Sequence, residues 1–195
     1  MLATMAVRMT RAAPVQVSKL VAGDAAEDDF FGTTVALSGD YALVGADYDD
    51  DGGSKSGSAY VFFRSGTSWS QQAKLVASDG AEGDLFGNSV ALSGDYALVG
   101  APNGGDLSGS MEPKSGSAYV FFRSGTSWSQ QAKLVASDAA EGDYLGKSVA
   151  LSGDYALVGA DYDDDGSTDS GSAYVFFRSG TSWSQQAKLV ASDGA

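Results

Sequence analysis

The sequence predicts an all-β chain: a β-propeller-type array of four-stranded antiparallel blades, with three blades after one orphan N-terminal strand. Two repeated blocks carry this prediction. One block, SGSAYVFFRSGTSWSQQAKLVASD, occurs unchanged at Ser56–Asp79, Ser115–Asp138 and Ser170–Asp193. The other, VALSGDYALVGA, occurs at Val35–Ala46, Val90–Ala101 and Val149–Ala160. Repeats of this length, filled with short apolar runs and Gly/Ser/Asp turns, are typical of propellers and similar arrays.

Four strands are predicted in each unit. In the first unit the sequence predicts strands over Thr33–Ser38 and Tyr41–Ala46, joined by a short SGD turn. A third strand is expected over Ser58–Arg64 and a fourth over Ser68–Ala77, joined by an SGT turn. Tight turns between successive strands imply an antiparallel meander.

The third strand is apolar on both faces. Alternation places Tyr60 and Phe62 on one face, and Val61 and Phe63 on the other. A sheet with two apolar faces needs a neighbour on each side, and stacking blades around an axis provides both. The fourth strand mixes Trp69 with glutamine and lysine, which suits a solvated rim. An open β-solenoid is the alternative architecture, although its coils are usually much shorter than these units.

Composition narrows the range of functions. The formal net charge of −13 disfavours binding to nucleic acid or anionic membranes and favours cations. The chain has no cysteine for disulfides or thiolate chemistry, and no histidine to act as a general base or metal ligand. Near-identical units also give no asymmetric acid/base pair, so we expect no enzymatic activity.

The repeats divide the chain into segments. Residues 1–14 contain two arginines and no acid and lack the repeat pattern, so we interpret them as a disordered or targeting leader. Residues 15–29 hold an orphan outer strand, Val15–Ala22, and an acidic loop. The three blades follow at residues 30–79, 80–138 and 139–195. No apolar run has the length needed to cross a bilayer.

Three pairs of glycine motifs resemble a known family. They are Phe31-Gly32 with Gly45-Ala46, Phe86-Gly87 with Gly100-Ala101-Pro102, and Leu145-Gly146 with Gly159-Ala160. These motifs resemble FG-GAP repeats, the blades of the integrin α-subunit propeller and of many microbial and algal surface proteins. The resemblance runs from Val15 to the C-terminus and is closest to the variant with a short SGD turn. It implies a β-propeller, often calcium-bearing, that serves adhesion or presents binding loops.

Two features depart from the family pattern. Integrin-type blades carry a DxDxDGxxD calcium loop between the FG and GAP halves. This chain has LSGDY at that place, so the family's metal site cannot be transferred. Propellers usually have four to eight blades, and this sequence supplies three.

A different loop offers a candidate metal site. In the third unit carboxylates stand at positions one, three, five and nine around a glycine at six: Asp161, Asp163, Asp165 and Asp169. Such spacing lets oxygens converge on one Ca²⁺ ion. The first unit repeats Asp47, Asp49 and Asp51 but has Lys55 at the ninth position, and the second unit has no comparable cluster. The alternative is a solvated acidic loop in which Asp and Gly shape the turn.

Two further residue sets recur between and within blades. One acidic set lies between blades, at Asp79, Glu82 and Asp84 and again at Asp138, Glu141 and Asp143. We expect these aspartates to accept hydrogen bonds from turn amides, since their spacing fits no ordinary metal loop. Trp69, Trp128 and Trp183 recur with fixed neighbours in every unit and are expected to serve structural packing, although exposed aromatic rings would also suit a sugar.

These observations predict a non-catalytic module for adhesion or protein–protein interaction at the cell surface or outside the cell, with calcium as a candidate stabilising ligand. Its partner is expected to be a protein bound by loops at one end of the propeller, or a second copy of the chain. The alternatives are a self-assembling subunit of an extracellular fibre or coat, and a carbohydrate-binding propeller. Neither nucleic-acid binding nor membrane insertion is expected.

Overall fold

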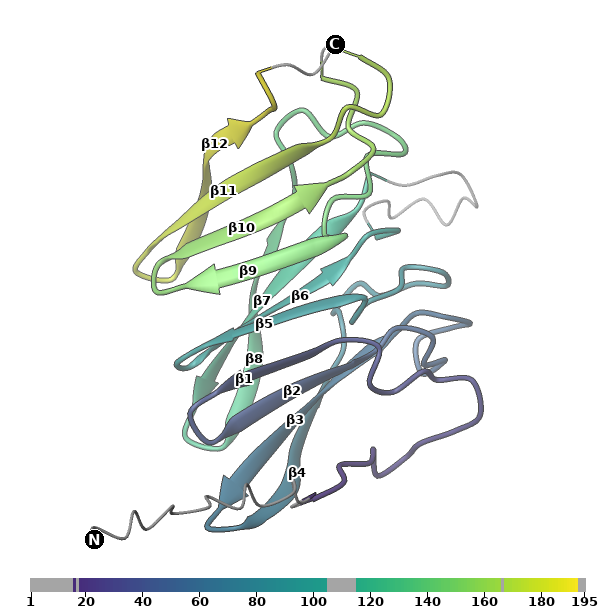
Figure 1. Cartoon of the computed structure of the whole chain (residues 1–195), viewed down its shortest axis with the longest axis vertical. Helices are drawn as coiled ribbons and strands as arrows, with labels where there is room; N and C mark the ends of the chain where they lie inside the picture. The colour runs from purple at the N-terminus through teal and green to yellow at the C-terminus, as the bar shows by residue number, and fades with distance from the viewer. Residues whose placement is uncertain (1–15, 17, 105–114, 166, 193–195) are drawn as a thin grey trace, which may run out of the picture.

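Three four-stranded antiparallel sheets make up the described chain and lie one above another (Figure 1). The computed structural model describes residue 16 and residues 18–104, 115–165 and 167–192. Within those residues there is no helix, and hence none able to span a membrane. The predicted all-β fold with blade-like units is confirmed. The leader predicted at residues 1–14 lies outside the described residues.

Each sheet is a meander in chain order. Blade 1 consists of β1 (Val35–Ser38), β2 (Tyr41–Ala46), β3 (Ser58–Ser65) and β4 (Ser68–Leu75). Blade 2 consists of β5 (Ser89–Ser93), β6 (Tyr96–Ala101), β7 (Ser117–Ser124) and β8 (Ser127–Leu134). Blade 3 consists of β9 (Ser148–Ser152), β10 (Tyr155–Ala160), β11 (Ser172–Ser179) and β12 (Ser182–Leu189).

The first and fourth strands are shorter than the sequence predicts. β1 begins two residues after Thr33, because the Thr33 amide closes a turn on the Phe30 carbonyl. The Thr34 carbonyl accepts a bond from the Gly45 amide of β2 and so continues the β1–β2 pairing by one residue. β4 ends at Leu75 in place of Ala77, where the chain turns towards the next blade.

The orphan segment Val15–Ala22 is not one of the twelve strands, although Val15 and Val17 lie outside the described residues. Its described part runs along blade 1, where Leu20 and Ala22 join the apolar cluster of Tyr60 and Phe62. The three inner strands with which this segment would pair are absent from the described chain. It therefore packs by its side chains and forms no ladder.

Both faces of the third strand are covered, as alternation predicts. Tyr60 and Phe62 of β3 pack on one side of blade 1, together with Phe31. Val61 faces the other side, in a cluster that includes Phe86 and Tyr119 of blade 2. The apolar core therefore lies between the sheets, and neighbouring blades bury one another.

A bulge in the outer strand links each blade to the next. The β3–β4 pairing skips Gln72 between Val61 and Phe62. Gln72 Oε1 accepts a hydrogen bond of 3.0 Å from Trp128 Nε1 in blade 2. The second bulge gives the same bond between Gln131 and Trp183, also at 3.0 Å. These two tryptophans are thus packing residues, as the sequence predicts.

The blades approach most closely at two glycines. A Cβ atom added to Gly45 would lie 2.1 Å from the Gly87 carbonyl oxygen, and one added to Gly100 would lie 2.0 Å from that of Gly146. Hydroxyl groups bond the same carbonyls: Thr34 Oγ1 donates to Gly87 at 2.9 Å, and Ser89 Oγ donates to Gly146 at 2.7 Å. The glycine of the FG motif in blades 2 and 3 (Gly87, Gly146) therefore packs against the glycine of the GA motif in the preceding blade (Gly45, Gly100). We call this contact the seam.

Replacing Gly100 by alanine is expected to destabilise the protein, because its Cβ would clash with the next blade's backbone. Overpacking of this kind costs about 1–3 kcal/mol, which lowers the melting temperature by roughly 2–10 °C in a chain of this size. Gly159 is the matched control, since its added Cβ would have its nearest contacts with Ser148 of its own sheet. Thermal melting of both variants in dilute solution makes the comparison. Equal falls in the melting temperature of the two variants would contradict the close approach of blades at the seam.

Candidate functional site

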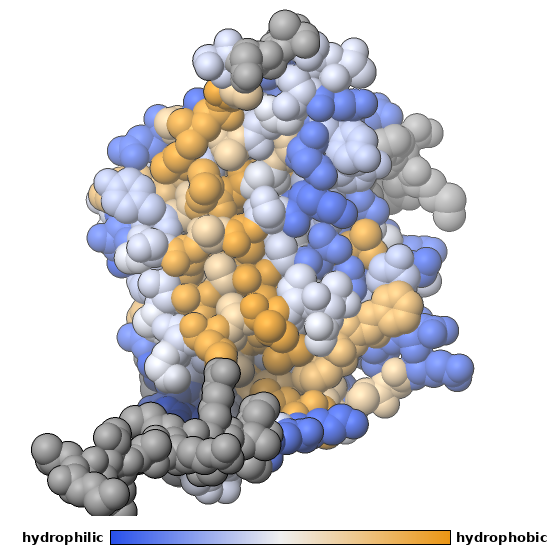
Figure 2. Space-filling model, viewed as in Figure 1, coloured by the Kyte–Doolittle hydropathy of each residue, from blue (hydrophilic) through white to orange (hydrophobic). Residues whose placement is uncertain are grey.

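The long loops gather along one side of the stack. The β2–β3, β6–β7 and β10–β11 connections lie there with the links between blades, and the six tight turns lie along the opposite side (Figure 1). Hydrophilic residues crowd the side of the long loops (Figure 2). We call this side the loop face.

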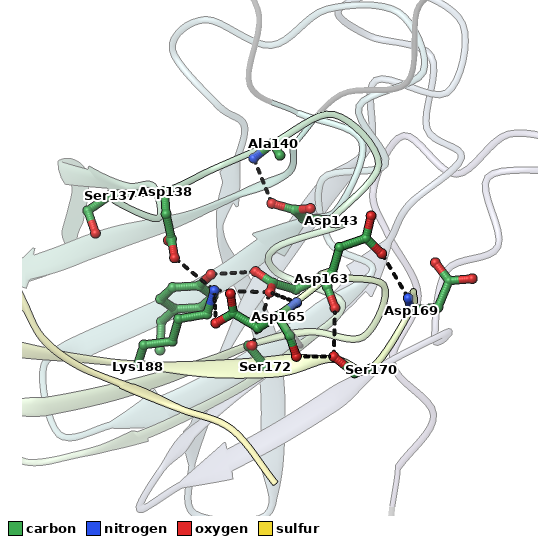
Figure 3. Close-up of polar contacts among 12 residues, drawn as sticks. Ser137, Asp138, Ala140, Asp143, Asp163, Asp165, Asp169, Ser170, Ser172 and Lys188 are labelled. Carbon is green, nitrogen blue, oxygen red and sulfur yellow. Dashed lines mark hydrogen bonds and ion pairs between the residues drawn. The ribbon is translucent and has the colours of Figure 1, made fainter. Parts of the chain in front are cut away.

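In blade 3 three carboxylates surround one lysine. Lys188 Nζ of β12 lies 2.7 Å from Asp138 Oδ2 and 3.0 Å from Asp163 Oδ1, and it also pairs with Asp165 (Figure 3). Asp138 arrives from the link between blades 2 and 3, and the other two acids come from the β10–β11 loop. We call these four residues the blade 3 cluster.

Asp163 is the buried member, with 5% of its side chain exposed. Tyr174 donates to its Oδ2 at 2.5 Å and Ser172 to its Oδ1 at 3.1 Å. Burial raises the pKa of Asp163, but the hydrogen bonds from Tyr174 and Lys188 outweigh burial and hold this pKa below its usual value. The carboxylate is therefore fully ionised at neutral pH.

Blade 1 builds the same cluster with a different third acid. Lys74 Nζ lies 2.8 Å from Asp24 Oδ2 and 2.9 Å from Asp49 Oδ2, and it also pairs with Asp51. Tyr60 donates to Asp49 at 2.7 Å. Asp24 belongs to the N-terminal segment, which takes the place that the link to the previous blade has in blade 3. We call Lys74, Asp24, Asp49 and Asp51 the blade 1 cluster.

Blade 2 has a reduced version. Lys133 pairs with Asp79 at 2.6 Å. Gly104 stands at the position of Asp49 and Asp163, so the buried carboxylate is missing there. Among the described residues of blade 2, the lysine thus has one acidic partner where blades 1 and 3 give it three.

The predicted metal ligands divide into two groups. Asp163 and Asp165, and likewise Asp49 and Asp51, converge on a lysine. Asp169 lies away from the blade 3 cluster, where its amide donates to Asp164 (Figure 3). Asp161 is exposed, and its carboxylate bonds to no described residue. Asp47 is buried in the seam, where it accepts a bond of 2.9 Å from Asn88 Nδ2.

Four members of these clusters, Lys74, Lys188, Asp24 and Asp138, were not predicted from the sequence. A signal was present, because a lysine and an aspartate stand five residues apart in each copy of KLVASD and in KLVAGD. Spacing along one loop does not show which outer strand packs over that loop.

As arranged here, the loops do not fit a calcium ion. One oxygen from each of Asp24, Asp49 and Asp51 lies within 4.8 Å of the others, which a cation requires, but the Lys74 ammonium pairs with all three. Calcium takes six to eight oxygen ligands, and neither Asp161 nor Asp169 contributes to the blade 3 cluster. Calcium binding by these loops stays a prediction, and it now requires that the ion displace a lysine.

The second acidic set partly serves turn geometry, as predicted. Asp84 Oδ2 accepts the Ala81 amide at 2.9 Å, and Asp143 Oδ2 accepts the Ala140 amide at 2.7 Å. Burial, with a smaller contribution from the charge of Asp163, raises the pKa of Asp143 despite its bond to the Ala140 amide. Asp79 and Asp138 differ from the expected role, because both pair with lysines.

A comparison with protein families identifies the repeats. The family model described as FG-GAP repeat matches residues 14–62, 69–121 and 128–176, together more than half of the chain. The chain belongs to the FG-GAP repeat family. No curated protein matches this FG-GAP chain in sequence.

The FG-GAP matches are offset from the blades. Each match ends within a third strand, at β3, β7 or β11. The second and third matches begin with the outer strands β4 and β8, and the first begins with the orphan segment. One FG-GAP repeat therefore joins the outer strand of one blade to three strands of the next.

Replacing Lys188 by methionine is expected to reverse the pH dependence of stability near the blade 3 cluster. In the native chain the lowered pKa of Asp163 stabilises the fold at pH values above the pKa that this carboxyl group has in the unfolded chain. This contribution is lost as the pH falls through the pKa of the folded state. Without the ammonium, burial and the like charges of Asp138 and Asp165 oppose the remaining hydrogen bonds from Tyr174 and Ser172, and we expect the pKa of Asp163 to rise. The variant should be destabilised by about 2–4 kcal/mol at pH 7 and recover part of this loss between pH 7 and pH 5.

Thermal melting across pH measures this effect, with Lys133→Met as the control because Lys133 has one acidic partner. A loss of stability in Lys188→Met that does not change with pH would contradict the assignment.

Calcium is expected to act more strongly once the lysine is gone. Millimolar calcium should raise the melting temperature of Lys188→Met more than that of the native chain, since the ion then neutralises three clustered carboxylates. Adding Asp163→Ala should lessen the rise. Melting curves with calcium or with a chelator test this, and no calcium-dependent shift in any of the three proteins would remove the calcium prediction.

Proposed function

We propose that this FG-GAP chain is a non-catalytic adhesion module, at the cell surface or outside the cell, that binds a protein partner through its loop face. The observation that carries the proposal is the gathering of exposed acids along this one side of a rigid blade stack. Exposed acids repeat in the link before each blade, at Glu27, Glu82 and Glu141. Loops held by a rigid scaffold are common sites of recognition.

Charge favours a partner with a basic surface. The two lysine clusters each hold three carboxylates and one ammonium, so each keeps a net negative charge. With a chain charge of −13, the loop face attracts cationic protein surfaces and speeds their approach. The same charge repels nucleic acid and anionic lipid.

The chemistry of the clusters supports a binding role over catalysis. Burial lowers the pKa of Lys188, but the hydrogen bonds that its ammonium donates to Asp138 and the other acids outweigh burial and raise this pKa above its usual value. The pKa of Lys74 is raised in the same way by its hydrogen bonds to Asp24 and the neighbouring acids. Both lysines therefore stay protonated at neutral pH and serve neither as a base nor as a nucleophile.

The lectin alternative has little support, because the Trp128 and Trp183 indoles bond to glutamines between blades. The alternative of a self-assembling structural subunit is supported by exposed apolar side chains on blades 1 and 3, among them Leu37 and Leu157.

Beads coated with the protein test the adhesion proposal on cells of the organism that makes it. Native beads should adhere. Neutralising three acids of the loop face (Glu27→Gln, Glu82→Gln and Glu141→Gln together) should weaken adhesion at least several-fold, since charge complementarity is lost. The matched control neutralises three acids on the tight-turn side, Asp40→Asn, Asp95→Asn and Asp154→Asn. Native beads that fail to adhere, or equal losses in the two triple variants, would overturn the proposal.

A further inference from the structure

Residues with identical sequence surroundings are buried in blades 1 and 2 and exposed in blade 3. Leu157 is 40% exposed, whereas Leu43 and Leu98 are fully buried. Leu189 is 50% exposed, whereas Leu75 and Leu134 are 3% exposed. In blades 1 and 2 these leucines lie in the clusters that join each blade to the next. We call this side of blade 3, with Tyr155, Leu157, Gly159 and Leu189, the trailing edge.

Blade 1 exposes the opposite side of the same contact. Val35 and Leu37 are 69% and 71% exposed. Leu92, the counterpart of Leu37, is 9% exposed, and Val90, the counterpart of Val35, is partly buried, because blade 2 packs against blade 1 there. We call this side of blade 1, with Gly32, Val35, Leu37 and Trp69, the leading edge. Figure 2 shows an apolar band that runs along the stack over the blades.

The two open edges also carry matching hydrogen-bonding groups. Within the chain, Trp128 and Trp183 donate to Gln72 and Gln131 of the preceding blade. The leading edge offers the equivalent donor, Trp69, which bonds to no described residue. The trailing edge offers the equivalent acceptor, Gln186, at the position skipped in the β11–β12 pairing.

The backbone contacts of the seam can be repeated as well. Ser89 Oγ donates to the Gly146 carbonyl, and Ser148 is its counterpart on the trailing edge, facing no further blade. The Gly94 and Gly153 amides bond to Ser38 and Ser93 of the preceding blade. Gly39 and Ser152 would form the same bond between two open edges.

We propose that the trailing edge of blade 3 binds the leading edge of blade 1 in a second copy of this chain, through the seam that already joins the blades within one copy. The second copy is the favoured occupant because its leading edge repeats the main residues buried at this contact within the chain: Val35, Leu37 and Trp69 correspond to Val90, Leu92 and Trp128. A head-to-tail contact between unlike surfaces generates a closed ring or an open filament. This inference does not depend on the function proposed for the loop face.

The N-terminal segment already occupies part of the leading edge. The Gly23 amide donates to Gln71 at 2.8 Å, as the Ser78 amide does to Gln130 and the Ser137 amide does to Gln185 at 2.9 Å. Asp24 pairs with Lys74 as Asp79 pairs with Lys133. Segment 19–24 thus takes the place that the link from a preceding blade takes elsewhere.

This occupancy creates a competition. In a head-to-tail pair, the end of the partner's β12 and the residues after it (188–192) repeat the sequence KLVAS and require the same place on blade 1. Segment 19–24 must therefore leave before a second copy can bind fully. It acts as a built-in competitor that holds the chain as single copies.

Light scattering on the full chain tests this inference at micromolar concentration and about 0.15 M salt, where charge repulsion is screened beyond roughly 8 Å. The double variant Ala22→Asp, Asp24→Lys releases the segment, because it places a charge in the apolar cluster and a like charge beside Lys74. Its mass should be at least twice that of one chain, while the native protein remains single. Glu27→Lys, which reverses one acidic charge as Asp24→Lys does but at an exposed position, should remain single.

Adding Gly159→Ala to the release variant should restore the mass of one chain. By analogy with Gly100, the new Cβ would lie about 2 Å from the backbone of the second copy and would prevent that copy from packing at the seam. Melting curves recorded alongside show whether each variant is folded, and Leu157→Asp provides a second block at an exposed position.

Four outcomes would overturn the inference. A folded release variant that stays single would do so, as would assembly that survives both Gly159→Ala and Leu157→Asp. Equal assembly of Glu27→Lys would show a charge effect and no competition. A native chain already assembled as fully as the release variant would show that segment 19–24 does not compete with a second copy.

Discussion

Each blade contacts the next where the carbonyl oxygen of one glycine packs against a second glycine, at a place with no room for a side chain. The rest of the structure depends on this seam. A four-stranded sheet with Tyr60 and Phe62 on one face and Val61 on the other cannot bury both faces alone. The approach of the Gly87 carbonyl to Gly45 brings the first two sheets close enough for Val61 to pack in one cluster with Phe86 and Tyr119 of blade 2. The bulge at Gln72 then fixes the outer strand to Trp128. Stability is therefore a property of neighbouring blades, and a blade with one neighbour keeps one open edge.

The acidic loops follow the same logic, because their counter-charge arrives from a different strand. Lys188 projects from the outer strand into the loop acids of its own blade and the link acid Asp138. Each cluster thereby ties a loop, a link and a strand together at the place where one blade follows another. The lysine lets Asp163 remain ionised while buried, and the excess of acids keeps the loop face negative.

Much of the fold could be predicted from the sequence, since three nearly identical copies fix the strands and their two-sided patterning makes stacking necessary. The candidate site was predictable in part. Asp163 and Asp165 lie close together in one loop and do converge, but Asp161 and Asp169 do not. Spacing along the chain gives the neighbours within a loop and not the partners, Lys188 and Asp138, that packing brings from elsewhere. The orphan segment was recognisable as an outer strand, yet without a sheet to extend it became a cover for blade 1.

Amide hydrogen exchange, measured by nuclear magnetic resonance on dilute protein, tests most directly whether burial in each blade comes from the blade that follows it. β6 and β10 have the same sequence, YALVGA, so their intrinsic exchange rates match. If the seam is the source of protection, Leu98 in β6 should exchange markedly more slowly than Leu157 in β10. Equal protection of the two leucines in a single copy would show that each blade is stable by itself and would contradict the account.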